Sequence, residues 1–70
     1  MTFREFIRVV EAHGFELVRQ RGTSHRIYKK VVRGKTRMVV VACHREGDDI
    51  RPGTLASMIR QSGLDKRPFR

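Results

Sequence analysis

Residues 38–42, Met-Val-Val-Val-Ala, most constrain the fold, because no other segment of this chain is as apolar and as prone to form a β-strand. We expect a strand over residues 37–43 that anchors a sheet. Side chains along a strand alternate between its two faces. One face would carry Met38, Val40 and Ala42, and the other Val39, Val41 and Cys43. The second apolar face indicates a partner surface, although a short strand that is simply apolar all round explains the pattern equally well.

A helix is predicted over residues 2–13, at the start of the chain. Its apolar residues follow the i, i+3, i+4, i+7 spacing of one helical face. They are Phe3, Phe6, Ile7 and Val10. Thr2 and Glu5 have the spacing of a capping box, and Gly14 suits a left-handed stop.

A second helix is predicted after a polar loop of residues 44–51. Pro52 suits the first helical turn and Gly63 the position after the last one. The apolar stripe consists of Leu55, Met58 and Ile59. Residues 65–70 are expected to form a loose basic tail.

Two further strands are predicted between the helices, over residues 16–21 and 25–32. A turn at residues 22–24 joins them into a hairpin, and residues 33–36 turn the chain into the strand of residues 37–43. The result is one α+β domain, residues 1–70, in the order α-β-β-β-α. A three-stranded antiparallel sheet with both helices on one face satisfies this burial pattern.

The charge of the chain indicates a partner. Sixteen Lys and Arg residues against seven Asp and Glu residues give a net charge of +9, as expected for a protein that binds phosphate backbones. A soluble basic domain or an acidic protein partner would fit the same charge. A single cysteine excludes an internal disulfide, and neither a signal peptide nor a membrane span is recognisable. We therefore expect a cytoplasmic protein.

Four segments together carry a family resemblance. They are the first helix with Gly14-Phe15, residues 22–28 (Gly-Thr-Ser-His-Arg-Ile-Tyr), residues 39–44 (Val-Val-Val-Ala-Cys-His) and residues 50–55 (Ile-Arg-Pro-Gly-Thr-Leu). In this combination the chain resembles, essentially end to end, the HicA-type toxins, or YcfA-like proteins, of bacterial and archaeal toxin–antitoxin pairs. Two positions depart from the family pattern: Thr23 lies inside the usual Gly-Ser-His turn, and Ala42 replaces a frequent proline.

The resemblance implies a fold like that of double-stranded-RNA-binding domains, a type II toxin that cleaves messenger RNA and arrests translation, and neutralisation by a HicB-type antitoxin. It also implies that His25 is catalytic. RNA cleavage requires a base for the attacking 2′-hydroxyl and an acid for the leaving 5′-oxygen, and histidine serves either role near neutral pH. Ser24 and His44 are candidate helpers. The end of the third strand should lie near the start of the second, although a surface histidine that merely ends a strand explains His44 equally well.

Seven cations between positions 21 and 37, with no acidic residue among them, predict an RNA-binding surface around His25. They are Arg21, Arg26, Lys29, Lys30, Arg33, Lys35 and Arg37. The loop acids Glu46, Asp48 and Asp49 suit surface solvation or capping of the second helix rather than a two-metal centre. We therefore expect no metal and no cofactor.

Two alternatives to a ribonuclease remain open from the sequence. The first is a non-catalytic RNA-binding module, in which His25 only contacts a phosphate. The second is a pure interaction protein whose apolar sheet face and positive charge bind an acidic partner. Cleavage of RNA by the purified protein, as opposed to retardation of intact RNA, separates the first alternative from the enzyme.

Overall fold

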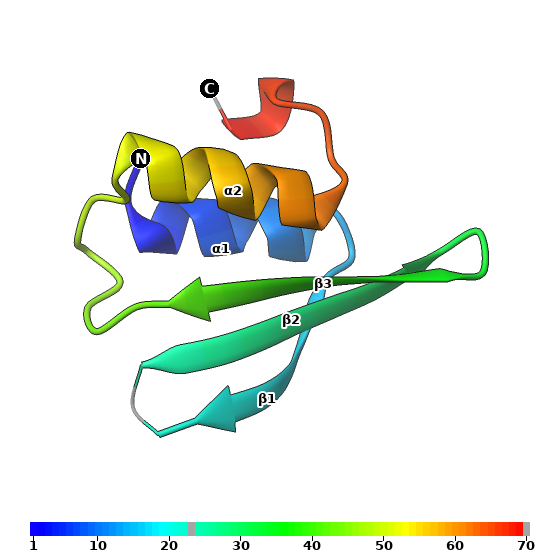
Figure 1. The fold of residues 1–70 in the computed structure, drawn as a ribbon, viewed down its shortest axis with the longest axis horizontal. Coiled ribbons are helices and arrows are strands. Elements are labelled where there is room, and N and C mark those ends of the chain that lie inside the picture. Colours follow the sequence, from blue (N-terminus) through cyan, green and yellow to red (C-terminus); the bar gives the residue numbers. More distant parts are fainter. Residues whose placement is uncertain (23, 70) are drawn as a thin grey trace.

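The structure is a computed structural model, and it describes residues 1–22 and 24–69. The elements are α1 (Phe3–Ala12), β1 (Glu16–Arg21), β2 (His25–Val32), β3 (Lys35–Ala42), α2 (Pro52–Ser62) and the short 3₁₀ helix η1 (Arg67–Phe69). The strands form one antiparallel sheet in the order β1-β2-β3. Figure 1 shows both α-helices on one side of this sheet, as the burial pattern predicted.

The start of α1 forms the predicted capping box. The Glu5 backbone N–H donates to Thr2 Oγ1 over 3.1 Å, and the Thr2 N–H donates to Glu5 Oε1 over 2.8 Å. These bonds satisfy two backbone donors that the first helical turn leaves free. They also lower the pKa of Glu5 below its ordinary value of 4.5, mainly through the Thr2 backbone N–H. Gly14 follows the helix with a φ of +92°, as predicted.

The second helix begins at Pro52, as expected, but among the described residues no carboxylate caps it. Its N-cap residue, Arg51, makes no capping hydrogen bond through its side chain. The loop acids bind elsewhere instead: Glu46 contacts Arg26, and Asp49 lies 3.8 Å from the N-terminal amine. These contacts fasten the loop to the rest of the fold. Of the two roles predicted for the loop acids, capping of the second helix is wrong, whereas surface solvation agrees with the exposure of Asp48 and Asp49.

The hairpin between β2 and β3 is tighter than the sequence suggested. Val32 pairs directly with Lys35, so β3 begins at Lys35 and the loop is only Arg33 and Gly34. Both loop residues have positive φ, 52° and 76°. Two consecutive positive φ values define the type I′ turn, whose twist matches that of the flanking strands. Gly34 supplies one of the two left-handed positions at little cost.

The core lies between the helices and one face of the sheet. Its buried side chains are Phe6, Ile7, Val10, Phe15, Tyr28, Val39, Val41, Cys43, Ile50, Met58 and Phe69. Phe69 corrects the prediction of a loose tail, because its ring stacks on Phe6 with centroids 5.1 Å apart and is only 6% exposed. The charges of this segment favour an exposed tail, but the buried Phe69 side chain holds it against the core. No helix in the described residues is long and apolar enough to cross a membrane.

Candidate nucleic-acid interface on the open sheet face

The face of the sheet opposite the helices is open, and it carries His25. Tyr28, Val39 and Val41 are buried under the helices. Residues one position away from them along each strand therefore point to the other face. On β2 and β3 that open face consists of His25, Ile27, Lys29, Val31, Thr36, Met38, Val40 and Ala42. Met38 and Val40 are 48% and 42% exposed, so the second apolar face expected from the sequence is present.

A β-bulge in β1 adds two arginines to this face. Leu17 pairs with Tyr28, but the next paired residue is Arg19, opposite Ile27, and Arg21 then pairs with His25. The extra residue, Val18, shifts the side-chain alternation by one position. Without this shift Arg19 and Arg21 would share the helix-facing side with Leu17. The bulge therefore accounts for a cation directly across from His25.

Arg19 is a cation that the sequence analysis missed. It lies outside the run of residues 21–37 and falls on the open face only because of the bulge. Lys29 of β2 pairs with Glu16 of β1 on one side and with Met38 of β3 on the other, and it is the third cation on this face. Arg19, Arg21 and Lys29 therefore form what we call the open-face cation group.

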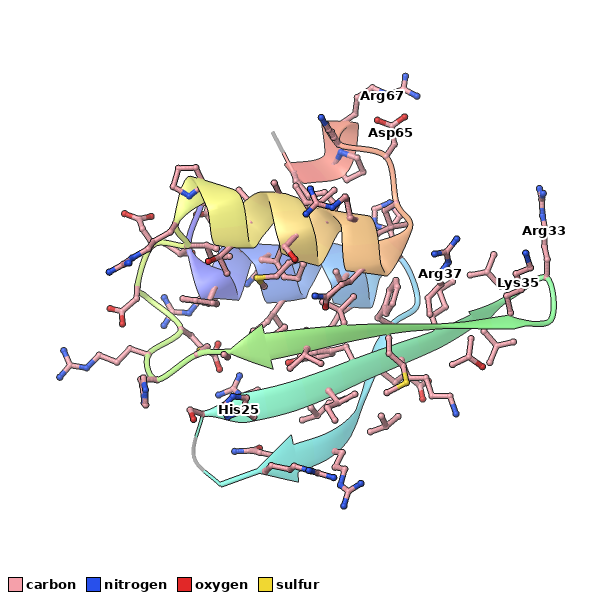
Figure 2. The ribbon with its side chains drawn as sticks, viewed as in Figure 1. His25, Arg33, Lys35, Arg37, Asp65 and Arg67 are labelled. Atoms are coloured by element: carbon pink, nitrogen blue, oxygen red, sulfur yellow. The ribbon has the colours of Figure 1, made fainter. Side chains whose placement is uncertain are left out.

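His25 is exposed and stands at the rim of the sheet, where β2 begins (Figure 2). Its strand neighbours are Arg21 on one side and Ala42 on the other. Ser24 Oγ lies 3.3 Å from His25 Nδ1, so a hydroxyl is available to fix the orientation of the ring. Gly22 supplies a left-handed residue to the preceding turn, with a φ of +61°. The departure at Thr23 lies outside the described residues.

His44 follows the end of β3, close in the backbone to His25. The Cys43 N–H donates to the Ser24 carbonyl over 2.7 Å, so the residues before His25 and His44 are hydrogen-bonded to each other. The predicted approach of the two strand ends is confirmed. His44 itself is exposed, and its chemical role stays a prediction.

Two predicted RNA-binding cations face the helices instead. Lys30 and Arg37 are cross-strand partners. The Lys30 ammonium donates to the His13 carbonyl at the end of α1. A Cβ placed on Gly63, at the end of α2, would lie 2.9 Å from Arg37 Nε, so the guanidinium packs against that helix end. Cations at helix C-termini are favoured by the helix dipole, and both side chains thus help to dock a helix on the sheet.

Arg26 also points away from His25. Arg26 Nη1 donates to Glu46 Oε2 over 2.8 Å, and Arg4 Nε lies 3.9 Å from Glu46 Oε1. The bond to Glu46 raises the pKa of Arg26, and the same bond lowers the pKa of Glu46 from its ordinary value of 4.5. This ion pair ties the loop after β3 to the helix-facing side of β2.

Arg33 and Lys35 lie at the hairpin tip, far from His25. Figure 2 shows them at the opposite end of the β2–β3 hairpin. The eight residues of β2 separate the two ends by about 23 Å at the usual rise along a strand. The expected clustering of all seven cations around His25 is therefore wrong: only Arg21 and Lys29 of that set share its face.

Two other side chains of the family segments are inaccessible. Tyr28 is 2% exposed and Cys43 is 1% exposed. Burial raises the pKa of both groups, which keeps the phenol and the thiol protonated near neutral pH. Tyr28 has no free ring face for stacking on a base. Among the described residues no three His, Cys, Asp or Glu side chains gather as metal ligands would.

Comparison with known proteins adds one match. A family model described as the HicA toxin of bacterial toxin–antitoxin systems matches residues 3–64 of the 70. The matched region contains α1, the whole sheet and α2, whereas η1 lies beyond it. No curated protein and no solved structure matched the chain.

Proposed function

The chain belongs to the HicA toxin family of bacterial toxin–antitoxin systems, and from that membership we propose that it is an endoribonuclease that cleaves messenger RNA and arrests translation. One observation carries this proposal: an exposed histidine and an arginine, His25 and Arg21, are cross-strand partners on an open sheet face. In this pair the imidazole can transfer a proton and the guanidinium can bind the phosphate that is cleaved.

In the proposed reaction His25 accepts the proton of a ribose 2′-hydroxyl. That oxygen forms a bond to the adjacent phosphorus, the bond to the 5′-oxygen breaks, and an acid protonates this leaving oxygen. The products are a 2′,3′-cyclic phosphate and a 5′-hydroxyl. His44 is the proposed acid, because the residue before it, Cys43, is hydrogen-bonded through its backbone to Ser24, the residue before His25. No metal takes part in this sequence of steps.

Ser24 is a positioning residue in this scheme. Its hydroxyl contacts Nδ1 of His25, which leaves Nε2 as the ring nitrogen that meets the substrate. A fixed ring orientation matters because proton transfer requires the base within hydrogen-bond distance of the proton it removes. We expect Ser24→Ala to lower the cleavage rate without changing the affinity for RNA.

Phosphate is held, in this proposal, by the open-face cation group. Arg21 lies directly across from His25, and Arg19 is two pairs further along the register, on the same face. Two nearby guanidiniums would stabilise the extra negative charge of the phosphorane. Arg21→Ala should therefore reduce cleavage strongly, whereas Lys35→Ala, which removes one charge at the distant hairpin tip, should not. Equal losses for both variants would show that only overall charge matters.

The proposed neutralising partner is an acidic HicB-type antitoxin. A chain of net charge +9 attracts an acidic protein rapidly. Met38 and Val40 give the open face an exposed apolar patch beside the cation group, which suits a protein interface as well as RNA. A bound antitoxin on this face would cover His25. We expect Met38→Asp to weaken the complex, and an unchanged affinity would place the antitoxin elsewhere.

The function is tested by producing the chain and its His25→Ala variant from an inducible promoter in bacterial cells. Wild-type protein should stop growth and shorten a reporter messenger RNA, and equal amounts of soluble variant should do neither. A variant that remains fully toxic would refute the role of His25. If neither protein shortens RNA and both retard it on a native gel, the chain is an RNA-binding module.

A further inference from the structure

A groove outside the His25 site lies between α2 and η1. Its volume is about 380 Å³, within the range of ligand-binding pockets. Its apolar lining includes Leu55, Ala56 and Ile59 of α2 and Phe69 of η1, and two cations, Arg60 and Lys66, complete it. Leu55 and Ile59 are half-buried and Ala56 is exposed, so part of the apolar face of α2 remains uncovered by the core.

The groove is on the far side of the molecule from His25. Figure 2 shows η1, marked by Arg67, beyond the helices on the side away from the strand that carries His25. Lys66 and Phe69 also lie after residue 64, where the family match ends. The groove is therefore built partly by residues that the family model does not include.

The two cations of the groove can bind acidic groups of another molecule. Arg60 and Lys66 are exposed, and no carboxylate pairs with either side chain among residues 1–22 and 24–69. The nearest acid in the sequence, Asp65, accepts hydrogen bonds from Arg67. An occupant that brings its own carboxylates to the groove would thus complement the local charge as well as the net charge of +9.

We propose that the groove between α2 and η1 binds an acidic amphipathic helix of a partner protein. Leu55, Ala56 and Ile59 follow the i, i+1, i+4 spacing of one helix face, so the apolar lining runs along the α2 axis. Such a groove takes the apolar side chains that a second helix presents at i, i+3 and i+4. A second copy of this chain is disfavoured, because two molecules of net charge +9 repel each other. A partner bound here leaves the face of His25 open, so this inference does not rest on the proposed function.

The test uses a designed peptide of about 16 residues, labelled with fluorescein, as the probe. Leucines occupy one face at i, i+3, i+4 and i+7, and glutamates and alanines occupy the rest. A scrambled peptide of identical composition controls for simple charge attraction. Binding to the full chain is measured by fluorescence anisotropy at physiological salt, where interactions between distant charges are screened. We expect saturable binding of the patterned peptide, at least about tenfold tighter than that of the scrambled one.

Two matched variants locate the binding. Ala56→Glu places a negative charge inside the groove, and Thr54→Glu places the same charge two residues away, outside its lining. Both positions are exposed, so neither variant should disturb the core. We expect Ala56→Glu to weaken peptide binding about tenfold or more and Thr54→Glu to change it by less than about twofold. Amide shifts of labelled protein should change around Ile59 and Phe69 and not around Ile27 and Val40.

Several results would overturn the proposal. Equal affinities of the patterned and scrambled peptides would mean that charge alone attracts them. Equal effects of the two variants, or amide shifts confined to the open sheet face, would place the peptide elsewhere. Displacement of the peptide by laurate at lower concentration than by unlabelled peptide would assign the groove to a fatty acid. None of these readouts requires RNA cleavage, so failure here is separate from failure of the proposed function.

Discussion

Phe69→Ala should destabilise the domain strongly, although the residue lies in a 3₁₀ helix of only three residues. The Phe69 ring is 6% exposed and stacks on Phe6, which is fully buried. Replacing a buried phenylalanine by alanine costs about 3–5 kcal/mol, and we expect the lower end because the three-residue helix η1 can relax around the gap. A domain of this size has a total free energy of unfolding of roughly 4–10 kcal/mol. The substitution therefore removes a large share of the stability.

Urea unfolding followed by circular dichroism measures this loss. With a slope of about 1 kcal/mol per M for a small domain, a loss of 3 kcal/mol lowers the midpoint by about 3 M. The control is Arg67→Ala in the same 3₁₀ helix, whose side chain is 82% exposed, and which should change the free energy of unfolding by less than about 0.5 kcal/mol. A loss below about 1 kcal/mol for Phe69→Ala would show that the terminal segment does not belong to the core.

Three further predictions concern the bulge, the loop and the end of α2. Deletion of Val18 should retain RNA cleavage, because Arg19 and Arg21 keep their partners. Deletion of Gln20 should instead turn Arg19 toward the helices and weaken cleavage, and the reverse order of the two deletions in a gel assay would contradict the register. The bond to Arg26 lowers the pKa of Glu46 in the fold, so the contribution of this carboxylate to stability is present above pH 4.5 and is lost as the pH falls further. The unfolding curves of wild type and Glu46→Gln should therefore differ slightly at pH 7 and converge in acid, and a gap that widens in acid would refute this. Gly63→Ala, at a φ of +69° and against Arg37, should cost about 1–2 kcal/mol in thermal or urea unfolding, whereas Gly53→Ala, with open space around it, should cost nothing.

The order of elements was predictable because each carries a local signal. The capping box of Thr2 and Glu5, the apolar spacing of α1 and the valine run of β3 depend only on near neighbours in the sequence. The turn between β2 and β3 was predicted to be too long. A two-residue turn requires Arg33 in the left-handed conformation, which a bulky residue rarely adopts, so the sequence did not indicate it. Pairing with β2 along the whole of β3 outweighs that local cost.

The positions of the cations were less predictable, because they depend on strand register. Arg26 and Arg21 look equivalent in the sequence, yet one binds Glu46 on the helix side and the other lies across from His25. A β-bulge has no clear sequence signal here, so the face of Arg19 could not be assigned. Lys30 is different, because period-2 alternation from Tyr28 already places it on the helix side, where its ammonium donates to the His13 carbonyl. Ser24 and His25 are neighbours in the sequence, so their proximity does not depend on strand register, and Ser24 Oγ lies 3.3 Å from His25 Nδ1. Their chemical roles stay predictions.

The most direct test of the proposed ribonuclease is cleavage of a defined RNA by the purified chain in excess chelator, analysed on a denaturing gel. Three reactions are compared: wild type with RNA, His25→Ala with the same RNA, and wild type with the same sequence methylated at every 2′-oxygen. Cleavage in the first reaction alone, with 2′,3′-cyclic phosphate ends, is the expected result. Equal cleavage by His25→Ala would contradict the role of His25, cleavage of the methylated strand would contradict attack by the 2′-hydroxyl, and intact RNA in all three would contradict a metal-independent ribonuclease.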